Sequence, residues 1–272
     1  MKAGWEKIKL ELAQKPKWEK VDVVSYPKSG RTWLRLLLGN YLKRRYGIPV
    51  DTILEGSKYV SLHRKIPAIR FTHSGSELTR ALSGKEMLGV LDRIQSDFIV
   101  LMVRDPLDVL VSSYFQAKKR KKCFNAPIGD FIRDEHMGLV KIILFYQWWM
   151  KNWDRLKRKE IIIYENLQKN TDAELSRAIK VIDPLRVAQD CLQGAISDCE
   201  FSKLKKMENE KAFSNKILTR TDEKDPESGK FRRGKVGGYL DYLSDQDLDF
   251  ADKLFNEKQF DYGKMIKKLS RN

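Results

Sequence analysis

The stretch VVSYPKSGRTWLR, residues 23–35, changes character in its middle. It opens with apolar, β-branched residues typical of a buried strand and closes with leucines at helical spacing. A strand-to-helix turn that contains glycine presents free backbone N–H groups at the positive end of the helix dipole, which suits phosphate or sulfate. Lys28 adds a charge, and Ser29 and Thr32 add hydroxyl groups. Taken alone, the pattern is equally compatible with an ordinary turn that carries a surface lysine.

This turn is not the loop of nucleoside-triphosphate enzymes. That loop requires G-x-x-x-x-G-K-[ST], whereas here the lysine precedes a single glycine. The turn is therefore expected to bind an anion other than a nucleoside triphosphate.

Apolar periodicity along the rest of the chain predicts an α/β domain. FIVLMV (98–103) is a continuous apolar run, as in a strand covered on both faces. We expect a three-layer α/β/α fold with a central parallel sheet and a P-loop-like strand–loop–helix turn, in one domain over 1–272. Strands are expected at 21–25, 98–103 and 161–164, helices at 5–14, 31–46, 105–118, 138–157, within 171–208, and at 245–257 and 260–269, irregular structure at 47–70, and a mobile loop at 209–235.

The composition narrows the class of protein and of partner. Lys and Arg number 53 against 37 Asp and Glu, and the resulting charge of +16 implies an anionic partner without choosing among nucleic acid, acidic membrane and phosphorylated or sulfated ligands. The three cysteines form no C-x-x-C pair or Cys/His cluster, so we expect a reducing compartment and no metal. The charged N-terminus is unlike a signal peptide, and the longest apolar run (142–150) is too short to span a bilayer. A cytoplasmic protein without a transmembrane segment is expected.

Two further segments place cations at turns. In RDPLDVLVSS (104–113), Arg104 follows the carboxyl end of a buried strand, where open α/β sheets bind ligands. Ser112 lies about two helical turns further on the same side of the following helix, so the pair suits a second phosphate group. FRRGKVGGY (231–239) gathers Arg232, Arg233 and Gly234 in a glycine-rich turn. By itself, the first segment also fits a capped helix with a surface arginine, and the second is more typical of a solvated loop.

Together and in this order, the three segments resemble the motifs of the PAPS-dependent sulfotransferase family, PAPS being 3′-phosphoadenosine 5′-phosphosulfate. YPKSGRTW resembles the family loop for the 5′-phosphosulfate, Y-P-K-S-G-[TS]-T-W. RDPLDVLVSSY is similar to R-x-P-x-D-x-x-x-S-x-Y, FRRGKVGGY to R-K-G-x-x-G-D-W, and IIIYENL to the strand end that carries a cofactor-binding tyrosine. The resemblance covers residues from about 21 to 262 and implies PAPS as donor, 3′-phosphoadenosine 5′-phosphate (PAP) as product, and no metal.

The resemblance also implies roles for individual residues. Lys28 would contact the bridging oxygen between the sulfuryl group and the phosphate, and Trp33 and Phe201 would hold the two faces of adenine. Tyr164 would reach the adenine as well. The backbone amides that would hold the 5′-phosphate are those of Ser29, Gly30, Arg31 and Thr32, and the 3′-phosphate would be bound by Arg104, Ser112, Arg232, Arg233 and Gly234.

Three features depart from the family pattern. Arg31 stands where many members have threonine, which adds charge but keeps the amide. Gly238 and Tyr239 replace the usual Asp-Trp, so the packing there differs. The K-x-x-x-T-V-x-x-x-E dimerisation signature is not present in the sequence, so dimerisation by that route has no support.

Sulfuryl transfer resembles phosphoryl transfer, so positioning and charge stabilisation are expected to dominate catalysis. Lys28 would meet the charge that grows on the leaving phosphate. The acceptor must lose a proton, and histidine suits that role. We predict His73 as the base, because it follows a short apolar strand and precedes a turn, with His63 and His136 as the alternatives.

Acceptor identity is not encoded in a recognisable motif. The basic run KKRKK (118–122) fits either a solvated helix end or an anionic acceptor. Nearby aromatic residues (Tyr114, Phe115, Phe124 and Phe131) fit an apolar acceptor pocket equally well, whereas the stripe Phe145, Trp148, Trp149 and Trp153 is assigned to the core.

The sequence therefore predicts a sulfotransferase that moves a sulfuryl group from PAPS to a hydroxyl or amine acceptor, with an anionic acceptor as one option and no specific nucleic-acid partner. The alternatives are a nucleotide kinase on a similar strand–loop–helix scaffold and a basic nucleic-acid-binding module.

Overall fold

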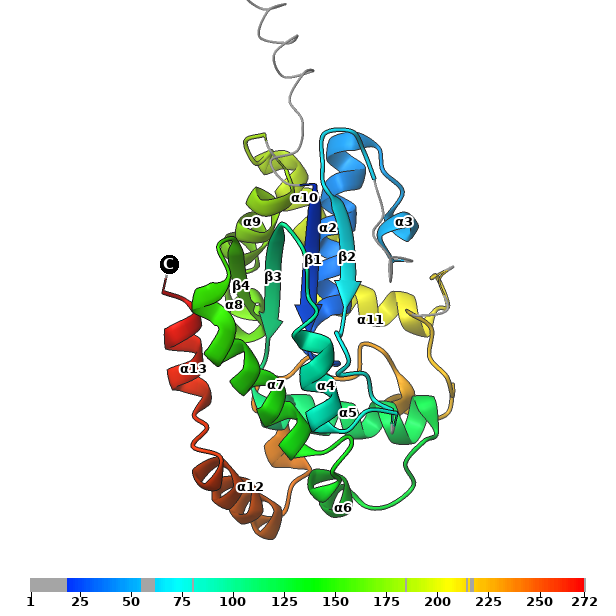
Figure 1. Cartoon of the computed structure of the whole chain (residues 1–272). Helices are drawn as coiled ribbons and strands as arrows, with labels where there is room; N and C mark the ends of the chain where they lie inside the picture. Colours follow the sequence, from blue (N-terminus) through cyan, green and yellow to red (C-terminus); the bar gives the residue numbers. More distant parts are fainter. Residues whose placement is uncertain are drawn as a thin grey trace, which may run out of the picture.

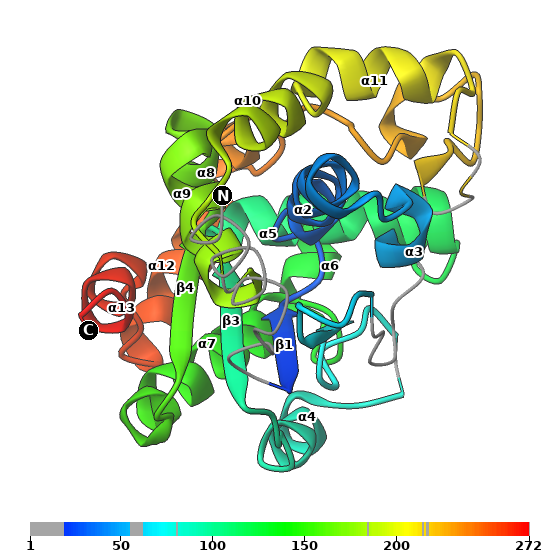
Figure 2. The same cartoon turned by 90° about the horizontal axis from the view of Figure 1, so that it is seen from above.

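A four-stranded parallel sheet forms the centre of the molecule, with strand order β2-β1-β3-β4. The computed structural model describes residues 19–54, 62–79, 81–183, 185–213, 215 and 218–271. The strands are β1 (Lys20–Ser25), β2 (Ala68–Thr72), β3 (Phe98–Val103) and β4 (Lys159–Ile163). Helices cover both faces of the sheet (Figures 1 and 2), which confirms the predicted three-layer α/β/α fold. The helix expected at 5–14 lies outside the described residues.

Strands β1, β3 and β4 are mainly apolar because they bury residues on both faces, whereas the edge strand β2 buries only Ile69 and Phe71, on one face. In β3, Leu101 and Val103 contribute to the core on one face of the sheet, whereas Val100 and Met102 contribute to the core on the other. The first face is covered by α4 (Gly84–Leu91), α5 (Pro106–Phe115), α6 (Ile128–Arg133), α7 (Leu139–Asn152), α12 (Asp245–Glu257) and α13 (Tyr262–Leu269). The second is covered by α2 (Arg31–Tyr46), α3 (Val50–Leu54), α8 (Tyr164–Lys169), α9 (Thr171–Ile182), α10 (Gln189–Asp198) and α11 (Phe201–Asn209).

Several predicted elements have different boundaries, and the helices α3, α4, α6 and α8 were not predicted. Residues 47–70 are not irregular throughout, because α3 and the start of β2 lie there. Helix α4 was not predicted, although Ser83 and Glu86 form a capping box at its start. The predicted helix 138–157 ends earlier, as α7 followed by the 3₁₀ turn η2 (Trp153–Arg155). Its aromatic stripe was correctly assigned: Phe145, Trp149 and Trp153 are in the core, and Trp148 packs at its edge.

Helix α5 continues as a π-helix, η1 (Gln116–Lys121), rather than ending near residue 118. Asp105 caps the start of α5, accepting hydrogen bonds from the backbone N–H groups of Leu107 and Asp108, with Pro106 at the first position. The wider turn of a π-helix directs successive side chains of the basic run to different neighbours.

The polar segment 209–235 packs against the domain at several points. Its side chains Leu218 and Phe231 are buried, and it includes the short 3₁₀ turn η4 (Pro226–Ser228). A second 3₁₀ turn, η5 (Gly238–Asp241), follows the glycine-rich segment. Within the described residues, none of the helices combines the length and the apolar character needed to cross a membrane.

Candidate active site

The carboxyl ends of all four strands meet at one edge of the sheet, and each delivers a predicted site residue. Following the spatial order of the strands, His73 follows β2, Lys28 follows β1, Arg104 follows β3 and Tyr164 follows β4. Ligands of open α/β sheets bind at this edge, next to the point where the strand order reverses. Parallel pairing therefore brings together side chains that are up to 136 positions apart in the chain (164 − 28).

The turn after β1 adopts a backbone that exposes its amides. Lys28 has φ of +70° and Gly30 has φ of +94°, and α2 begins at Arg31. The Trp33 and Leu34 N–H groups donate to the Gly30 carbonyl oxygen at 2.9 and 3.2 Å, whereas helix geometry leaves the N–H groups of the preceding residues directed outward from the helix start. The turn thus presents an anion site of the predicted kind.

Gly30 is required at this turn for space as well as for conformation. A Cβ atom added there would lie 2.4 Å from Cδ2 of Tyr164 and 2.9 Å from Cε of Met102. The Tyr164 ring therefore packs directly on the turn, which explains why a residue from the far strand β4 helps to shape the site.

The Lys28 side chain is half-buried and surrounded by other cations. Its Nζ donates to Oε1 of Gln116, at the start of the π-helix, over 3.3 Å. Burial lowers the pKa of Lys28 well below its usual value, and the charges of Lys230 and Arg120 lower it further. An anion beside Lys28 would offset both effects.

Arg104 occupies a second cationic position. Its guanidinium donates to the backbone carbonyl oxygens of Lys28 (3.4 Å) and Lys235 (3.1 Å), and it lies 4.3 Å from the centre of the Tyr164 ring. Its Nη2 is 3.4 Å from a carboxylate oxygen of Asp108. Its Nε is buried and has no hydrogen-bond partner among the described residues. The side chain is thus held in place with one donor left unused.

Asp108 links the glycine-rich segment (231–239) to Arg104. Its carboxylate accepts hydrogen bonds from the N–H groups of Gly237 (2.9 Å) and Tyr239 (3.1 Å). The substitution of Gly238 and Tyr239 for Asp-Trp therefore leaves an ordered turn, held by a carboxylate from α5. Gly234, with φ of +61°, packs on the Phe201 ring, which lies 2.7 Å from the place of a Cβ atom.

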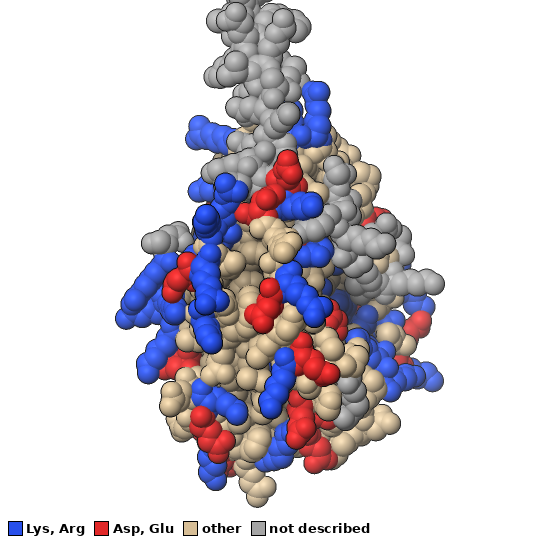
Figure 3. Space-filling model, in the orientation of Figure 1, with Lys and Arg blue, Asp and Glu red and all other residues tan. Residues whose placement is uncertain are grey.

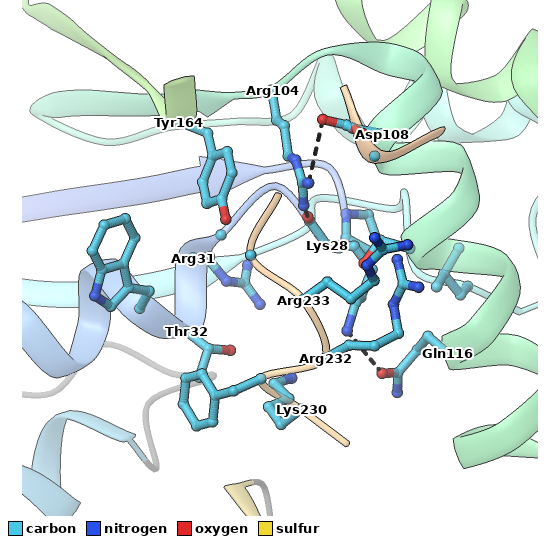
Figure 4. Close-up of a pocket in the computed structure, with 18 of the residues that line it drawn as sticks. Lys28, Arg31, Thr32, Arg104, Asp108, Gln116, Tyr164, Lys230, Arg232 and Arg233 are labelled. Atoms are coloured by element: carbon cyan, nitrogen blue, oxygen red, sulfur yellow. Dashed lines mark hydrogen bonds and ion pairs between the residues drawn. The ribbon is translucent and has the colours of Figure 1, made fainter. Parts of the chain in front are cut away.

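Arg232 and Arg233 approach the same space from this segment (Figure 4). Arg232 donates to Glu227 (2.8 Å) and to the Tyr242 hydroxyl (2.7 Å), and it stacks over the Phe115 ring at 4.4 Å. Arg233 is paired with Asp241 at 2.6 Å. These contacts hold both guanidinium groups beside the cavity.

Aromatic side chains form the opposite wall. Trp33 packs edge-on against Tyr164 with 6.2 Å between ring centres, and its Nε1 donates to the Cys199 carbonyl oxygen at 2.9 Å. Phe201 makes a similar edge contact with Phe231. Trp33, Tyr164 and Phe201 all line the cavity, so flat ring surfaces are available next to the cationic groups.

His73 is half-buried beside the Lys28 turn, and both of its ring nitrogens are engaged. Nδ1 lies 2.8 Å from the carbonyl oxygen of Ser25, and Nε2 lies 2.8 Å from Nη2 of Arg31. Because a carbonyl oxygen only accepts and a guanidinium only donates, Nδ1 carries the proton and Nε2 has the lone pair. Burial lowers the pKa of His73 well below its usual value, and the charge of Arg31 adds to the effect, so the ring is neutral at pH 7.

The alternative histidines lie elsewhere. His63 stacks on Tyr46 with 4.9 Å between ring centres, and the His136 backbone N–H donates to Asp134. Neither histidine lines the cavity.

A single cavity of about 310 Å³ joins these groups. Of the predicted site residues, all line it except Ser29, whose side chain is fully buried and whose N–H donates to the Tyr26 carbonyl oxygen at 3.4 Å. Several lining residues were not predicted from sequence: Arg35, Glu77, Asp108, Gln116, Lys121, Lys230 and Lys235.

The charge of the cavity wall is strongly positive. Nine of the described residues that line it are cationic, namely Lys28, Arg31, Arg35, Arg104, Lys121, Lys230, Arg232, Arg233 and Lys235, against the two acids Glu77 and Asp108. Other cations lie on the outer surface, where they gather on the side formed by α13 and the end of α7 (Figure 3). The cavity itself is therefore built for a polyanion.

The basic run 118–122 has a mainly structural role. Lys118 donates to the Tyr114 hydroxyl (2.8 Å), and Lys119 pairs with Asp225 (2.7 Å). Arg120 donates to the carbonyl oxygens of Thr219 and Ser228, which ties segment 218–230 to the π-helix. Lys121 alone of these lines the cavity. The aromatic residues Tyr114, Phe124 and Phe131 pack edge-to-face on one another in the core, and Phe115 packs against this core and contacts Tyr242.

Comparison with known proteins agrees with this site. The sequence model of the sulfotransferase domain matches residues 19–263. Cytosolic sulfotransferase 12 of Arabidopsis thaliana is 24% identical, over 88% of this chain and 76% of its own length. Flavonol 3-sulfotransferase of Flaveria bidentis is also 24% identical, over 91% of this chain and 84% of its own length.

Solved structures show the same fold at lower sequence identity. Mouse sulfotransferase SULT7A1 complexed with PAP superposes with a TM-score of 0.62 at 17% identity, covering 96% of this chain and 91% of that one. Retinol dehydratase in complex with androsterone and inactive cofactor PAP gives a TM-score of 0.56 at 17% identity, covering 91% and 82%.

The fold and the cationic edge of the sheet define a nucleotide-dependent group-transfer enzyme. The chain belongs to the sulfotransferase family, whose domain spans nearly its whole length. This confirms the predicted enzyme class over the nucleotide kinase and the nucleic-acid-binding module.

Proposed function

We propose that this sulfotransferase binds PAPS along the cationic edge of the sheet and passes its sulfuryl group to a hydroxyl or amine acceptor. The observation that carries the proposal is the convergence of His73, Lys28, Arg104 and Tyr164 from four strand ends on one cavity. The two solved relatives described above hold PAP, which supports the choice of nucleotide.

The residues present fit such a ligand. Arg104 Nε is a buried donor without a hydrogen-bond partner among the described residues, as expected of a group that binds an anion. The turn at Gly30 excludes any side chain, so a phosphate can approach its amides closely.

The cavity wall divides into parts that match the parts of the nucleotide. The amides of Gly30, Arg31 and Thr32 would hold the 5′-phosphate, with the Thr32 hydroxyl beside them. Trp33, Tyr164 and Phe201 would enclose adenine. A third group of residues would bind the 3′-phosphate: Arg104, Ser112, Arg232, Arg233 and the Gly234 backbone. The Ser29 side chain is buried, so only its amide could take part, and that N–H would first have to leave the Tyr26 carbonyl oxygen.

When bound, PAPS supplies the sulfuryl group and a leaving phosphate that gains negative charge. Lys28 is the residue that stabilises this charge, since it sits in the turn with its Nζ held by Gln116. His73 is the base that takes the acceptor proton on Nε2, while the Ser25 carbonyl fixes the tautomer through Nδ1. Arg31 must leave Nε2 before the proton can arrive there.

Labelled PAPS and a panel of acceptors test the proposal. Wild-type enzyme should transfer label, whereas His73→Ala should bind PAP with nearly unchanged affinity and lose turnover by a factor of about 10²–10⁴, the range typical for a general base. His63→Ala is the matched control and should keep its turnover. Full turnover in His73→Ala would dismiss its role as the base.

The relatives also support coarser features of the protein. One relative is named cytosolic sulfotransferase 12, and this name supports the cytoplasmic location expected for the present protein. The name of flavonol 3-sulfotransferase and the androsterone bound to retinol dehydratase indicate hydroxyl-bearing small molecules as acceptors in this family.

A further inference from the structure

Arg31 has more donors than its surroundings use. One terminal nitrogen, Nη2, donates to His73 Nε2 at 2.8 Å. The other, Nη1, is buried and has no hydrogen-bond partner among the described residues. An unsatisfied buried guanidinium N–H is costly, so its persistence in a cavity indicates a ligand. Because Arg31 contacts the proposed base, that ligand lies on the acceptor side of Lys28.

Two lysines complete this end of the cavity. Lys121 reaches it from the π-helix and donates to the Leu78 carbonyl oxygen at 3.1 Å, close in sequence to His73. Lys230 reaches it from the segment before the glycine-rich turn, where the carboxylate of Glu208 is occupied by the backbone N–H groups of Lys230 and Phe231. Figure 4 shows Lys28, Arg31 and Lys230 directed into one space.

The Lys230 side chain makes no hydrogen bond or ion pair with the described part of the chain. Burial lowers its pKa to about 7, and the charges of Arg120 and Arg31 add to the effect. The nearby lining acid is Glu77, whose side chain is exposed and whose charge acts on Arg31. Glu208 lies beside Lys230 as well, so three cations face two acids at this end.

We propose that Arg31, Lys121 and Lys230 form a subsite for a carboxylate on the acceptor, so that the enzyme sulfates hydroxyl-bearing acids. The proposal rests on the proposed function, because it assigns the acceptor side from the position of His73. These three side chains are distinct from the groups proposed to bind the nucleotide. Those groups are the backbone amides of the turn at Gly30 and the Arg104 cluster, which consists of Arg104, Ser112, Arg232, Arg233 and Gly234.

The same contact links recognition to the base. The guanidinium that would pair with the carboxylate is the one that now covers the lone pair of His73 Nε2. A carboxylate that draws Arg31 toward itself thus exposes Nε2 to the acceptor hydroxyl. A neutral acceptor leaves Nε2 covered.

Binding to the enzyme–PAP complex tests the subsite without turnover. The probes are 4-hydroxyphenylacetate against 4-hydroxyphenylacetamide, and 3-hydroxybutyrate against 3-hydroxybutyramide, titrated by calorimetry at saturating PAP. We expect the wild type to bind at least one acid about tenfold or more tightly than its amide, as one partly buried charged contact implies. In Lys230→Met that preference should fall below about threefold, whereas Lys253→Met, which removes an exposed cation of α12, should retain it.

The outcomes are decisive for each claim. Equal binding of acid and amide, binding of neither, or an undiminished preference in Lys230→Met would overturn the subsite. Failure of PAP itself to bind would instead overturn the proposed function. The ¹⁵N resonance of His73 Nε2, assigned with His73→Gln, should shift when the acid joins the PAP complex and stay in place with the amide. An unchanged resonance at saturating acid would refute the displacement of Arg31.

Discussion

Replacement of Gly30 by alanine perturbs the turn through two separate effects. The residue has φ of +94°, where an L side chain costs about 1–2 kcal/mol. The new methyl group would also lie 2.4 Å from Cδ2 and 2.7 Å from Cε2 of the Tyr164 ring, and displacing a packed ring typically costs about 1–3 kcal/mol more.

We therefore expect Gly30→Ala to lower the free energy of unfolding by about 2–5 kcal/mol. For a domain of this length that corresponds to a Tm lower by about 4–10 °C. PAP should also bind at least about tenfold more weakly, because the Tyr164 ring and the first amides of α2 must move apart.

Gly47→Ala is the matched control for backbone strain alone. Gly47 has φ of +72° at the end of α2, and nothing lies within 4 Å of the place of its Cβ atom. Its substitution should lower Tm by about 2–4 °C and leave PAP affinity unchanged. Thermal unfolding with and without PAP measures both variants. If Gly30→Ala is as stable as Gly47→Ala and binds PAP normally, the inferred crowding by Tyr164 is wrong.

Three further predictions concern charged groups. Asp108→Asn replaces one of the two carboxylate oxygens that accept from the Gly237 and Tyr239 N–H groups by an NH₂ group, which cannot accept. Urea unfolding should show a free energy of unfolding lower by about 1–3 kcal/mol, and PAP should bind more weakly. Unchanged stability and affinity would contradict the role of Asp108 in the turn. Arg70→Met leaves the buried Asp22 without its 2.6 Å partner and should cost about 2–4 kcal/mol at constant PAP affinity; altered affinity would count against treating the pair as purely structural. The pKa of His73 is lowered on folding, so below about pH 6.5 the unfolded state binds more protons than the folded state. The free energy of unfolding should therefore fall as the pH drops from 7 to 5, by at most about 1.4 kcal/mol per pH unit. His73→Gln should flatten that slope, and an equal slope in the variant would exclude His73 as its source.

Much of the sheet could be predicted because β3, most of β1 and the end of β4 are apolar. FIVLMV was assigned as a strand covered on both faces, and β3 is buried on both sides. The turn at Gly30 was recognised because glycine, lysine and hydroxyl residues stand between a strand and a helix. Helix α4 was missed although Ser83 and Glu86 gave the signal of a capping box.

The composition of the cavity was less accessible to sequence reasoning. Lys230 and Lys121 come from a loop and a π-helix, and neither position follows from a local period. The contact between Arg31 and His73 joins residues 42 positions apart, and it depends on the pairing of β1 with β2. Asp108 was not singled out from the sequence, yet its carboxylate accepts a hydrogen bond from a turn that lies 129 positions later.

The central claim is that a single bound nucleotide contacts both the Lys28 turn and the Arg104 cluster. Calorimetric titration of the wild type with PAP and with 5′-AMP, which lacks the 3′-phosphate, tests this most directly. PAP should bind at least about 100-fold more tightly, since two or more charge-assisted hydrogen bonds of about 1.5–3 kcal/mol each are lost without that phosphate. Equal affinity for the two nucleotides would contradict the account.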